Sequence, residues 1–262
     1  MTDALTQPDT RTDLVVSTVT DGVAHLELNR PEAFNAANLP LADALEAALL
    51  SAARDDSVGV VLLSGRGRAF CAGGDVKAMA AADDTPGMVT ELAEASHRAV
   101  RALAALEKPV VAAVHGSVAG AGLGYACAAD IVLAGESTKF LSAFIGIGVS
   151  PDSGTSWYLP RIVGLRRALE LQLLNRVLSA EEARDWGIVT AIHPDGEVHA
   201  AGLALAQRLA SGPAAALGRT RRLLHDSLDR TLDAHLDQEA AGIVHFVGTP
   251  EAQALVQAFG SR

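Results

Sequence analysis

Two stretches rich in glycine and alanine offer backbone chemistry where their side chains offer little. Residues 65–79 read GRGRAFCAGGDVKAM, and residues 117–130 read SVAGAGLGYACAAD. Each follows an apolar run of buried-strand type, so the peptide groups of residues 72–74 and 120–122 are expected near helix N-termini, where amides lack intrahelical acceptors and attract an anion. If the two loops converge, their amides would form an oxyanion hole, which stabilises an enolate or a tetrahedral oxyanion.

Other interpretations of these glycines remain open. Glycine at a strand-to-helix turn also permits a left-handed backbone or close packing. A dinucleotide site is disfavoured, because Gly120, Gly122 and Gly124 give G-x-G-x-G rather than G-x-G-x-x-G, and no βαβ unit with an acid for a ribose opens the chain. The sequence GSVAG at 116–120 is not the G-x-S-x-G turn of serine hydrolases.

Among the side chains, Asp152 lies between apolar segments and is a candidate proton carrier. The alternative is that it caps a helix that begins near Gly154. His97 shares one side of a predicted helix with small apolar residues, and it is either a base or a structural histidine. Asp75 and Asp130 are expected in turns or caps. The other histidines and the two cysteines lack metal-ligand spacing, so no metal is expected.

The elements that must position these groups alternate between strands and helices. An Asp21-Gly22 turn predicts a hairpin, and Asn38 followed by Pro40 predicts a helix start. Short connections between the elements predict an α/β fold in which helices cover mostly parallel strands. Further strands are expected at 58–63, 109–114, 131–134 and 188–192, with an extended piece near Phe140 and a helix at 88–106.

The pattern divides the chain into three parts. Residues 1–13 are polar and are expected to be a flexible tail, and residues 14–195 carry the α/β pattern. Residues 196–262 are helical, with Thr249-Pro250-Glu251 as a helix start. One helix in this last part has an apolar side that is expected to dock on the chain's own core or on a neighbouring subunit; it is formed by Leu232, His235, Leu236, Ile243 and Val247.

Composition excludes several classes of function. With 262 residues and 49% apolar content, the chain can bury a substantial core. Its 21 basic and 31 acidic residues give a net charge of −10, which disfavours nucleic acid and anionic membranes as partners. No apolar run has the length of a signal peptide or a membrane span, and two cysteines cannot form a disulfide framework. We therefore expect a cytoplasmic protein.

Four motifs resemble the crotonase, or enoyl-CoA hydratase/isomerase, superfamily. They are LNRPEAFNA at 28–36, GRAFCAGGDV at 67–76, KPVVAAVHGSVAGAGLG at 108–124 and PDSGTSWYLPRIVG at 151–164. The resemblance implies a spiral core of repeated ββα units and a helical C-terminal region that builds trimers or hexamers. It also implies an acyl-CoA thioester as the substrate, with no separate cofactor.

The resemblance assigns roles by position. The two oxyanion-hole amides fall on Gly74 and Ala121. The substrate-binding positions would be Arg30, Ala33, Ala72, Lys77 and Phe144, with the CoA nucleotide near the first four; for the two basic residues a solvated surface charge is the alternative.

The sequence departs from the hydratases at both catalytic acids. Gly124 and Phe144 stand where hydratases carry glutamates, so hydration of a double bond is disfavoured. The PDSGTSWYLPR motif resembles a branch with epoxyphenylacetyl-CoA isomerases, in which an aspartate at the position of Asp152 moves a proton. We therefore expect an enoyl-CoA isomerase. Aryl-CoA dehalogenase-like hydrolysis with Asp152 and His97, hydratase activity, and non-catalytic acyl-CoA binding remain the alternatives.

Overall fold

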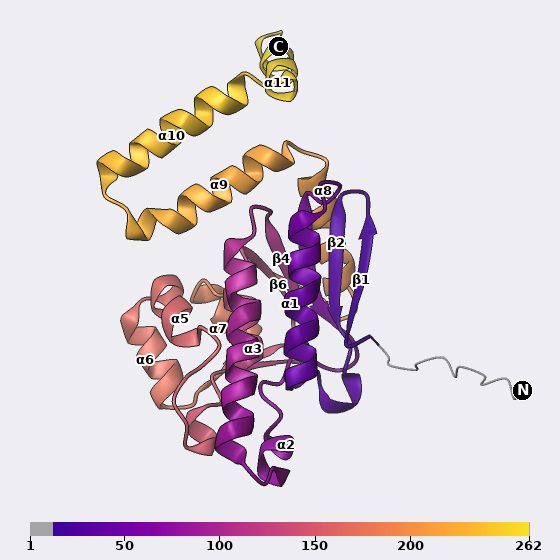
Figure 1. Ribbon diagram of the computed structural model, residues 1–262, viewed down its shortest axis with the longest axis vertical. Coiled ribbons are helices and arrows are strands. Elements are labelled where there is room, and N and C mark those ends of the chain that lie inside the picture. Colours follow the sequence, from indigo (N-terminus) through magenta and orange to yellow (C-terminus); the bar gives the residue numbers. More distant parts are fainter. Residues whose placement is uncertain (1–12, 262) are drawn as a thin grey trace, which may run out of the picture.

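The computed structural model describes residues 13–261, so nearly all of the expected tail at 1–13 lies outside the described residues. Within this range no helix is both long and apolar enough to cross a membrane. The architecture is a six-stranded sheet with the order β1-β2-β3-β4-β6-β9, a second sheet of three short strands, and helices on both faces of the larger sheet (Figure 1).

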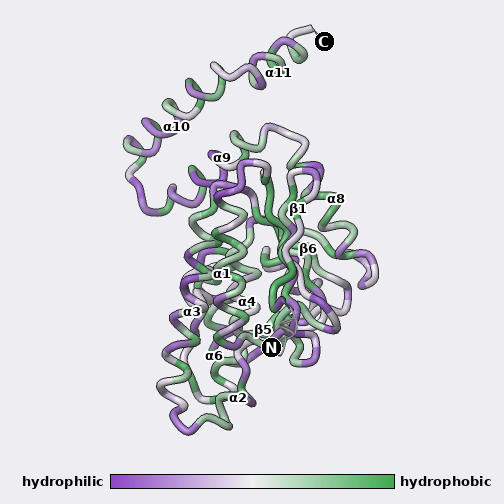
Figure 2. The backbone as a smooth tube through the Cα atoms, turned by 45° about the vertical axis from the view of Figure 1, so that its right-hand side comes forward, coloured by the Kyte–Doolittle hydropathy of each residue, from purple (hydrophilic) through white to green (hydrophobic). Residues whose placement is uncertain are grey.

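The large sheet opens with the expected hairpin. Asp21 and Gly22 both have positive φ values, 51° and 76°, which suits a tight turn between antiparallel strands. The remaining strands are parallel, and their largely apolar sequences colour the sheet as hydrophobic (Figure 2). The central ones are almost entirely buried, whereas the short edge strand Ala191–His193 is only half-buried. The strands are β1 (Val15–Thr20), β2 (Val23–Leu28), β3 (Val60–Gly65), β4 (Val110–Val114), β6 (Ile131–Gly135) and β9 (Ala191–His193).

The strand expected at 188–192 is wrong in its first half. Only Ala191–His193 pairs with β6, and the amides of Ile188 and Val189 both donate to the carbonyl of Ala183 at the end of the preceding helix. These two residues are buried against the core as a turn, so their apolar character reports packing and not strand pairing.

The second sheet is formed by short strands, two of which directly follow long strands of the first sheet along the chain. It contains β5 (Ser117–Ala119), β7 (Lys139–Leu141) and β8 (Val177–Ser179). Single parallel bridges, Cys71 with Val118 and Ala37 with Gly74, extend the same layer into the earlier units. A long strand is thus followed by a short extended piece and then a helix, which confirms the repeated ββα arrangement.

Two long helices cover the face of the sheet that bears the candidate loops. α1 (Leu39–Arg54) begins at the predicted Asn38 cap, whose side chain accepts from the Leu41 amide, and it packs along α3 (Thr85–Ala105). α8 (Val198–Ala210) covers the opposite face. α4 (Ala121–Cys127) is buried along its whole length. The other helices are α2 (Val76–Ala81), α5 (Thr155–Val163), α6 (Leu165–Leu173), α7 (Ala180–Asp185), α9 (Ala214–Asp226), α10 (Leu232–Val247) and α11 (Pro250–Gly260).

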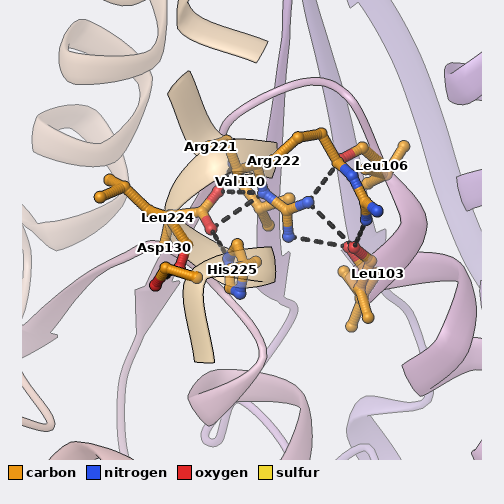
Figure 3. A network of polar contacts seen from close by, with 10 residues as sticks. Leu103, Leu106, Val110, Asp130, Arg221, Arg222, Leu224 and His225 are labelled. Carbon is orange, nitrogen blue, oxygen red and sulfur yellow. Dashed lines mark hydrogen bonds and ion pairs between the residues drawn. The ribbon is translucent and has the colours of Figure 1, made fainter. Parts of the chain in front are cut away.

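A buried ion-pair network ties α9 to the core (Figure 3). The Arg221 guanidinium contacts the Asp130 carboxylate at 2.7 Å and donates to the carbonyls of Leu103, Ala104 and Leu106 at the end of α3. Asp130 also accepts from the Val110 amide. Asp130 is therefore structural, as expected, and it fixes α3 relative to β4.

Beyond α9 the chain leaves the core. α10 and α11 extend away from the rest of the molecule, with α11 starting at the predicted Thr249 cap (Figures 1 and 2). The sequence predicts an apolar side for α10, and its aliphatic members are all exposed in the protomer, namely Leu232, Leu236, Ile243 and Val247. Docking of this side on the chain's own core is therefore wrong.

Candidate active site

The two glycine-rich loops do converge, on a cavity of about 380 Å³. Residues 72–74 line one side and Gly120 and Ala121 line another. One face of α3 and the segment 143–153 close the remaining walls, and most of their lining side chains are apolar. The convergence predicted from the strand-loop-helix pattern is thus present.

The amides of Gly74 and Ala121 are free to bind a ligand oxygen. Ala121 is the first residue of α4, so its amide has no intrahelical acceptor. One neighbouring amide of each residue is engaged: Asp75, after Gly74, donates to Ala37, and Gly120, before Ala121, donates to Leu141. Within residues 13–261, the amides of Gly74 and Ala121 themselves donate to no backbone acceptor outside helices and strands. Two unpaired donors lining one cavity can stabilise an oxyanion.

The two loops pack so closely against each other that several positions have no room for a side chain. Gly120 has a φ of 49°, and a Cβ atom there would lie 3.2 Å from the Cα atom of Gly73. A Cβ atom on Gly122 would lie 2.4 Å from the carbonyl oxygen of Cys71. The glycines therefore serve close packing, and the same close packing brings the donor amides of the two loops to one cavity. The two interpretations are compatible.

Asp152 lines the same cavity and contacts His97. The His97 Nε2 atom lies 2.5 Å from Asp152 Oδ1, and the Ser153 hydroxyl donates to Asp152 Oδ2 at 3.2 Å. The Asp152 carboxylate does not cap α5, since that helix begins after Gly154 without a side-chain cap, so the capping interpretation is wrong. His97 does not line the cavity; it holds Asp152 from the outer side, where both side chains are partly exposed.

The residues at the two missing glutamate positions have different surroundings. A Cβ atom on Gly124 would lie 2.2 Å from the carbonyl oxygen of Ser153, so the backbone that carries Asp152 occupies the space of any side chain there. Phe144 lines the cavity, where its ring contributes an apolar wall. The chain therefore has no carboxylate at either position.

The other expected binding residues lie beside the cavity. Arg30 contacts the Asp75 carboxylate at 2.7 Å and donates to the Ala36 carbonyl, so its charge braces the first loop. Burial opposes ionisation of Asp75, but hydrogen bonds from the Ala78 amide and from Arg30 outweigh it and lower the pKa of this carboxyl. Lys77 is exposed and Ala33 is partly exposed; neither lines the cavity, whereas Ala72 does.

Both cysteines are poor candidates for a nucleophile. Each is buried, and burial raises the pKa of the Cys71 thiol to about 11 and that of Cys127 to about 12. No group of three or more His, Cys, Asp or Glu side chains in the described part of the chain has the geometry of a metal site.

Sequence reasoning missed the contribution of α3 to the cavity. Val89, Leu92, Ala93 and Ser96 line it from one face of the helix, and Tyr125 of α4 hydrogen-bonds to Ser96 from behind. The signal was present, because these α3 positions have the i, i+3, i+4, i+7 spacing of one helix face. That spacing does not reveal which surface the helix face covers.

Comparison with known proteins agrees with this geometry. Residues 18–261 match the enoyl-CoA hydratase/isomerase family. The chain is 39% identical over 231 residues to the 1,2-epoxyphenylacetyl-CoA isomerase of Escherichia coli, covering 87% of each protein, and 34% identical over 245 residues to 4-chlorobenzoyl coenzyme A dehalogenase-2 of an Arthrobacter species, covering 93% of this chain and 89% of that protein.

A solved structure gives the same result for the fold. An enoyl-CoA hydratase from Polaromonas sp. JS666 superimposes with a TM-score of 0.89 at 30% identity, covering 95% of this chain and 97% of that one. The family match, the identities and the shared fold support one conclusion: the chain belongs to the enoyl-CoA hydratase/isomerase family, within the crotonase superfamily.

Proposed function

We propose that this protein is an enoyl-CoA isomerase that moves a double bond along the acyl chain of a CoA thioester. One observation carries the proposal: among the described residues that line the cavity, Asp152 is the only one with an ionisable side chain. Hydration needs one group to activate water and another to deliver a proton, whereas a proton shift needs a single carboxylate. The similar proteins include a 1,2-epoxyphenylacetyl-CoA isomerase.

In the proposed mechanism, the thioester oxygen binds between the amides of Gly74 and Ala121. The Asp152 carboxylate removes a proton from the acyl chain, and the resulting dienolate places negative charge on the oxygen that these amides contact. The protonated Asp152 then returns the proton two carbons away. His97 and Ser153 fix the two carboxylate oxygens and so orient Asp152 during both transfers.

The experiment is deuterium incorporation from D2O into a panel of 3-enoyl- and 2-enoyl-CoA esters, followed by mass spectrometry. Wild-type protein is expected to shift the double bond and to introduce deuterium. Asp152→Asn is expected to lose both while retaining acyl-CoA binding, because the amide cannot accept the proton. Turnover that is unchanged in Asp152→Asn would overturn the proposal.

A second candidate is hydrolytic dehalogenation of an aryl-CoA. The observation that favours it is the contact between Asp152 and His97, because a carboxylate nucleophile and an adjacent histidine base would suit that reaction. Against it, His97 lies outside the cavity lining, and Phe144 is the only aromatic side chain among the described lining residues. Halide release from a halogenated benzoyl-CoA would favour this candidate over isomerisation.

We propose further that the protein is a cytoplasmic homotrimer or hexamer. Support comes from the large apolar residues that α10 and α11 leave exposed in the protomer, because many exposed apolar side chains on neighbouring helices are typical of a protein interface. Sedimentation of the purified protein tests the assembly.

A further inference from the structure

We propose that the Ser96 hydroxyl forms a subsite for a second oxygen atom of the substrate, carried by the acyl group beyond the thioester. The ligand class is an acyl thioester that bears a hydroxyl, ketone, ether or epoxide oxygen. This proposal rests on the proposed function in one respect, namely that an acyl thioester occupies the cavity.

Ser96 lies at the floor of the cavity, at the end of an otherwise apolar face. Along α3 the exposed fraction falls from 37% at Val89 to 5% at Leu92 and 2% at Ser96. All three line the cavity with Ala93, so the helix face runs from the rim inward. Ser96 is the polar member of this face, and an acyl group that fills the cavity reaches it.

The hydroxyl of Ser96 is not used by its own helix. Two other hydroxyls on helices, those of Thr90 and Thr220, donate to the carbonyls four residues before them, Pro86 and Ala216. The carbonyl one turn earlier is a common hydrogen-bond partner for a Ser or Thr hydroxyl on a helix. Within residues 13–261 the Ser96 hydroxyl has one hydrogen-bond partner, the Tyr125 hydroxyl at 3.2 Å.

The burial of Tyr125 decides which hydroxyl donates. Tyr125 is 1% exposed, and burial raises the pKa of its hydroxyl, which therefore stays protonated. If Ser96 donated to Tyr125, the Tyr125 proton would be left without a partner inside the core, which costs about 1–3 kcal/mol. If Tyr125 donates, the proton left over belongs to Ser96, which faces the cavity. The second arrangement is favoured, and it presents a hydrogen-bond donor to the ligand.

A donor held in this way discriminates between acyl groups. An acyl oxygen that accepts from Ser96 satisfies the hydroxyl, whereas a purely hydrocarbon chain removes water from it and offers nothing in return. Sites built to bond a substrate oxygen reject the analogue that lacks it. Ser96 is thus assigned as a specificity-determining residue and takes no part in the proton shift.

The test is binding of saturated esters by titration calorimetry. The probes are hexanoyl-CoA and its derivatives with a hydroxyl or a ketone at carbon 3, 4 or 5. At least one derivative is expected to bind wild-type protein about tenfold more tightly than hexanoyl-CoA, as one good hydrogen bond allows. Ser96→Ala is expected to abolish that preference. Thr90→Ala removes a hydroxyl from the same helix away from the cavity and is expected to keep it.

Stability must be separated from specificity. Ser96→Ala leaves the Tyr125 hydroxyl without its partner, so the double variant Ser96→Ala/Tyr125→Phe, which removes both hydroxyls, is measured beside it. No preference in wild type for any derivative, or the same preference in both variants, would overturn the proposal. If an ordered water accepted the Ser96 proton in every complex, wild type would show no preference, and the proposal would be overturned.

These outcomes are distinguishable from failure of the isomerase assignment. The saturated esters contain no double bond to move, so their binding does not depend on the reaction. Turnover that persists in Asp152→Asn removes the isomerase mechanism and leaves the Ser96 preference standing. Turnover that depends on Asp152, with no preference for oxygenated esters, removes only the subsite.

Discussion

At the scale of single residues, Gly124 illustrates how packing limits the chemistry of this site. The Ser153 carbonyl lies where a side chain at position 124 would begin. The close contact holds the Asp152 segment against α4. It excludes a glutamate at position 124 and at the same time places the Asp152 carboxylate at the cavity.

Substitution of Gly124 is therefore expected to damage stability and activity together. Gly124→Ala should reduce the free energy of unfolding by about 1–3 kcal/mol, as overpacking does, and should displace Asp152 from the cavity. Urea unfolding and isomerase turnover measure the two effects. Gly196→Ala is the matched control, because nothing lies within 4 Å of a Cβ atom there and its backbone is not left-handed. Equal stability of the two variants would contradict this account.

His97 is expected to act by positioning Asp152. His97→Gln retains a hydrogen-bonding side chain but does not reproduce the contact at 2.5 Å, so turnover should fall by up to about 100-fold, as small misplacement of a catalytic group allows. Asp152→Asn should lose turnover completely. Comparing the KM and kcat values of both variants separates the roles: a positioning residue changes kcat with little change in KM. Complete loss in His97→Gln would instead favour the hydrolytic candidate.

At the scale of elements, the sequence predicts long features better than short ones. The hairpin, the buried parallel strands and the helix caps at Asn38 and Thr249 follow from local patterns and are present. The strands of the second sheet have three residues each, too few for a periodic pattern. The Ile188-Val189 pair was mistaken for a strand because burial alone does not distinguish a turn from a strand.

The candidate site divides in the same way. The two loops were predictable because each is a local strand-turn-helix pattern, and Asp152 was predictable from its motif. The contact with His97 joins residues 55 positions apart, and the wall of α3 depends on how that helix packs. The spacing of residues along α3 indicates an apolar helix face, but it does not show which surface that face covers or which side chain His97 contacts.

The network around Arg221 is expected to stabilise the attachment of α9 to the core. Its side chain is 3% exposed, and it joins α9 to Asp130 and to the end of α3. Arg221→Met is expected to lower the free energy of unfolding by about 1–3 kcal/mol, because the carbonyls of Leu103, Ala104 and Leu106 lose their donor, whereas His225 stays beside the Asp130 carboxylate.

Urea unfolding measures this loss, and the neighbouring Arg222 supplies a control. Arg222 pairs with Asp226 one turn along on α9, with 30% of its side chain exposed, and it reaches the end of α3 through one longer hydrogen bond, 3.4 Å to the Ala104 carbonyl. Arg222→Met is expected to cost at most about 1 kcal/mol, as exposed pairs do. Similar losses in the two variants would show that the network contributes no more than a surface pair.

At the scale of the whole molecule, stability should fall in two stages as pH decreases. Burial lowers the pKa of His25, with Glu27 opposing and Arg66 adding to the effect, and burial together with His115 lowers the pKa of His199. The unfolded chain therefore binds protons more readily at these rings, so stability is lost as pH falls below about 6.5. The lowered pKa values of carboxyls such as Asp75 act separately, at about pH 4 and below.

Urea unfolding between pH 8 and pH 5 isolates the first stage. The free energy of unfolding is expected to decrease toward pH 5 in wild type, and the decrease is expected to become smaller in His25→Asn and in His199→Gln, which remove the titrating rings. A decrease of unchanged size in both variants would exclude these histidines as its source.

The C-terminal helices are expected to mediate assembly of subunits. Ile243 and Val244 on α10 are each 71% exposed and Phe259 on α11 is 80% exposed, while a groove of about 760 Å³ lies between α10 and the core. Burying such residues contributes about 1.5–3 kcal/mol each, which association of subunits would provide. We expect a trimer or hexamer in sedimentation velocity experiments.

Ile243→Asp should shift the distribution toward smaller species, because a charge replaces an apolar contact without touching the protomer core. Asp237→Asn, an exposed polar change on the same helix, is expected to leave assembly unchanged. Since the cavity is built from the core and not from α10, the dissociated variant should also retain the fold that brings Gly74, Ala121 and Asp152 together. A wild-type protein that sediments as a monomer at all concentrations would show that these helices are covered in some other way.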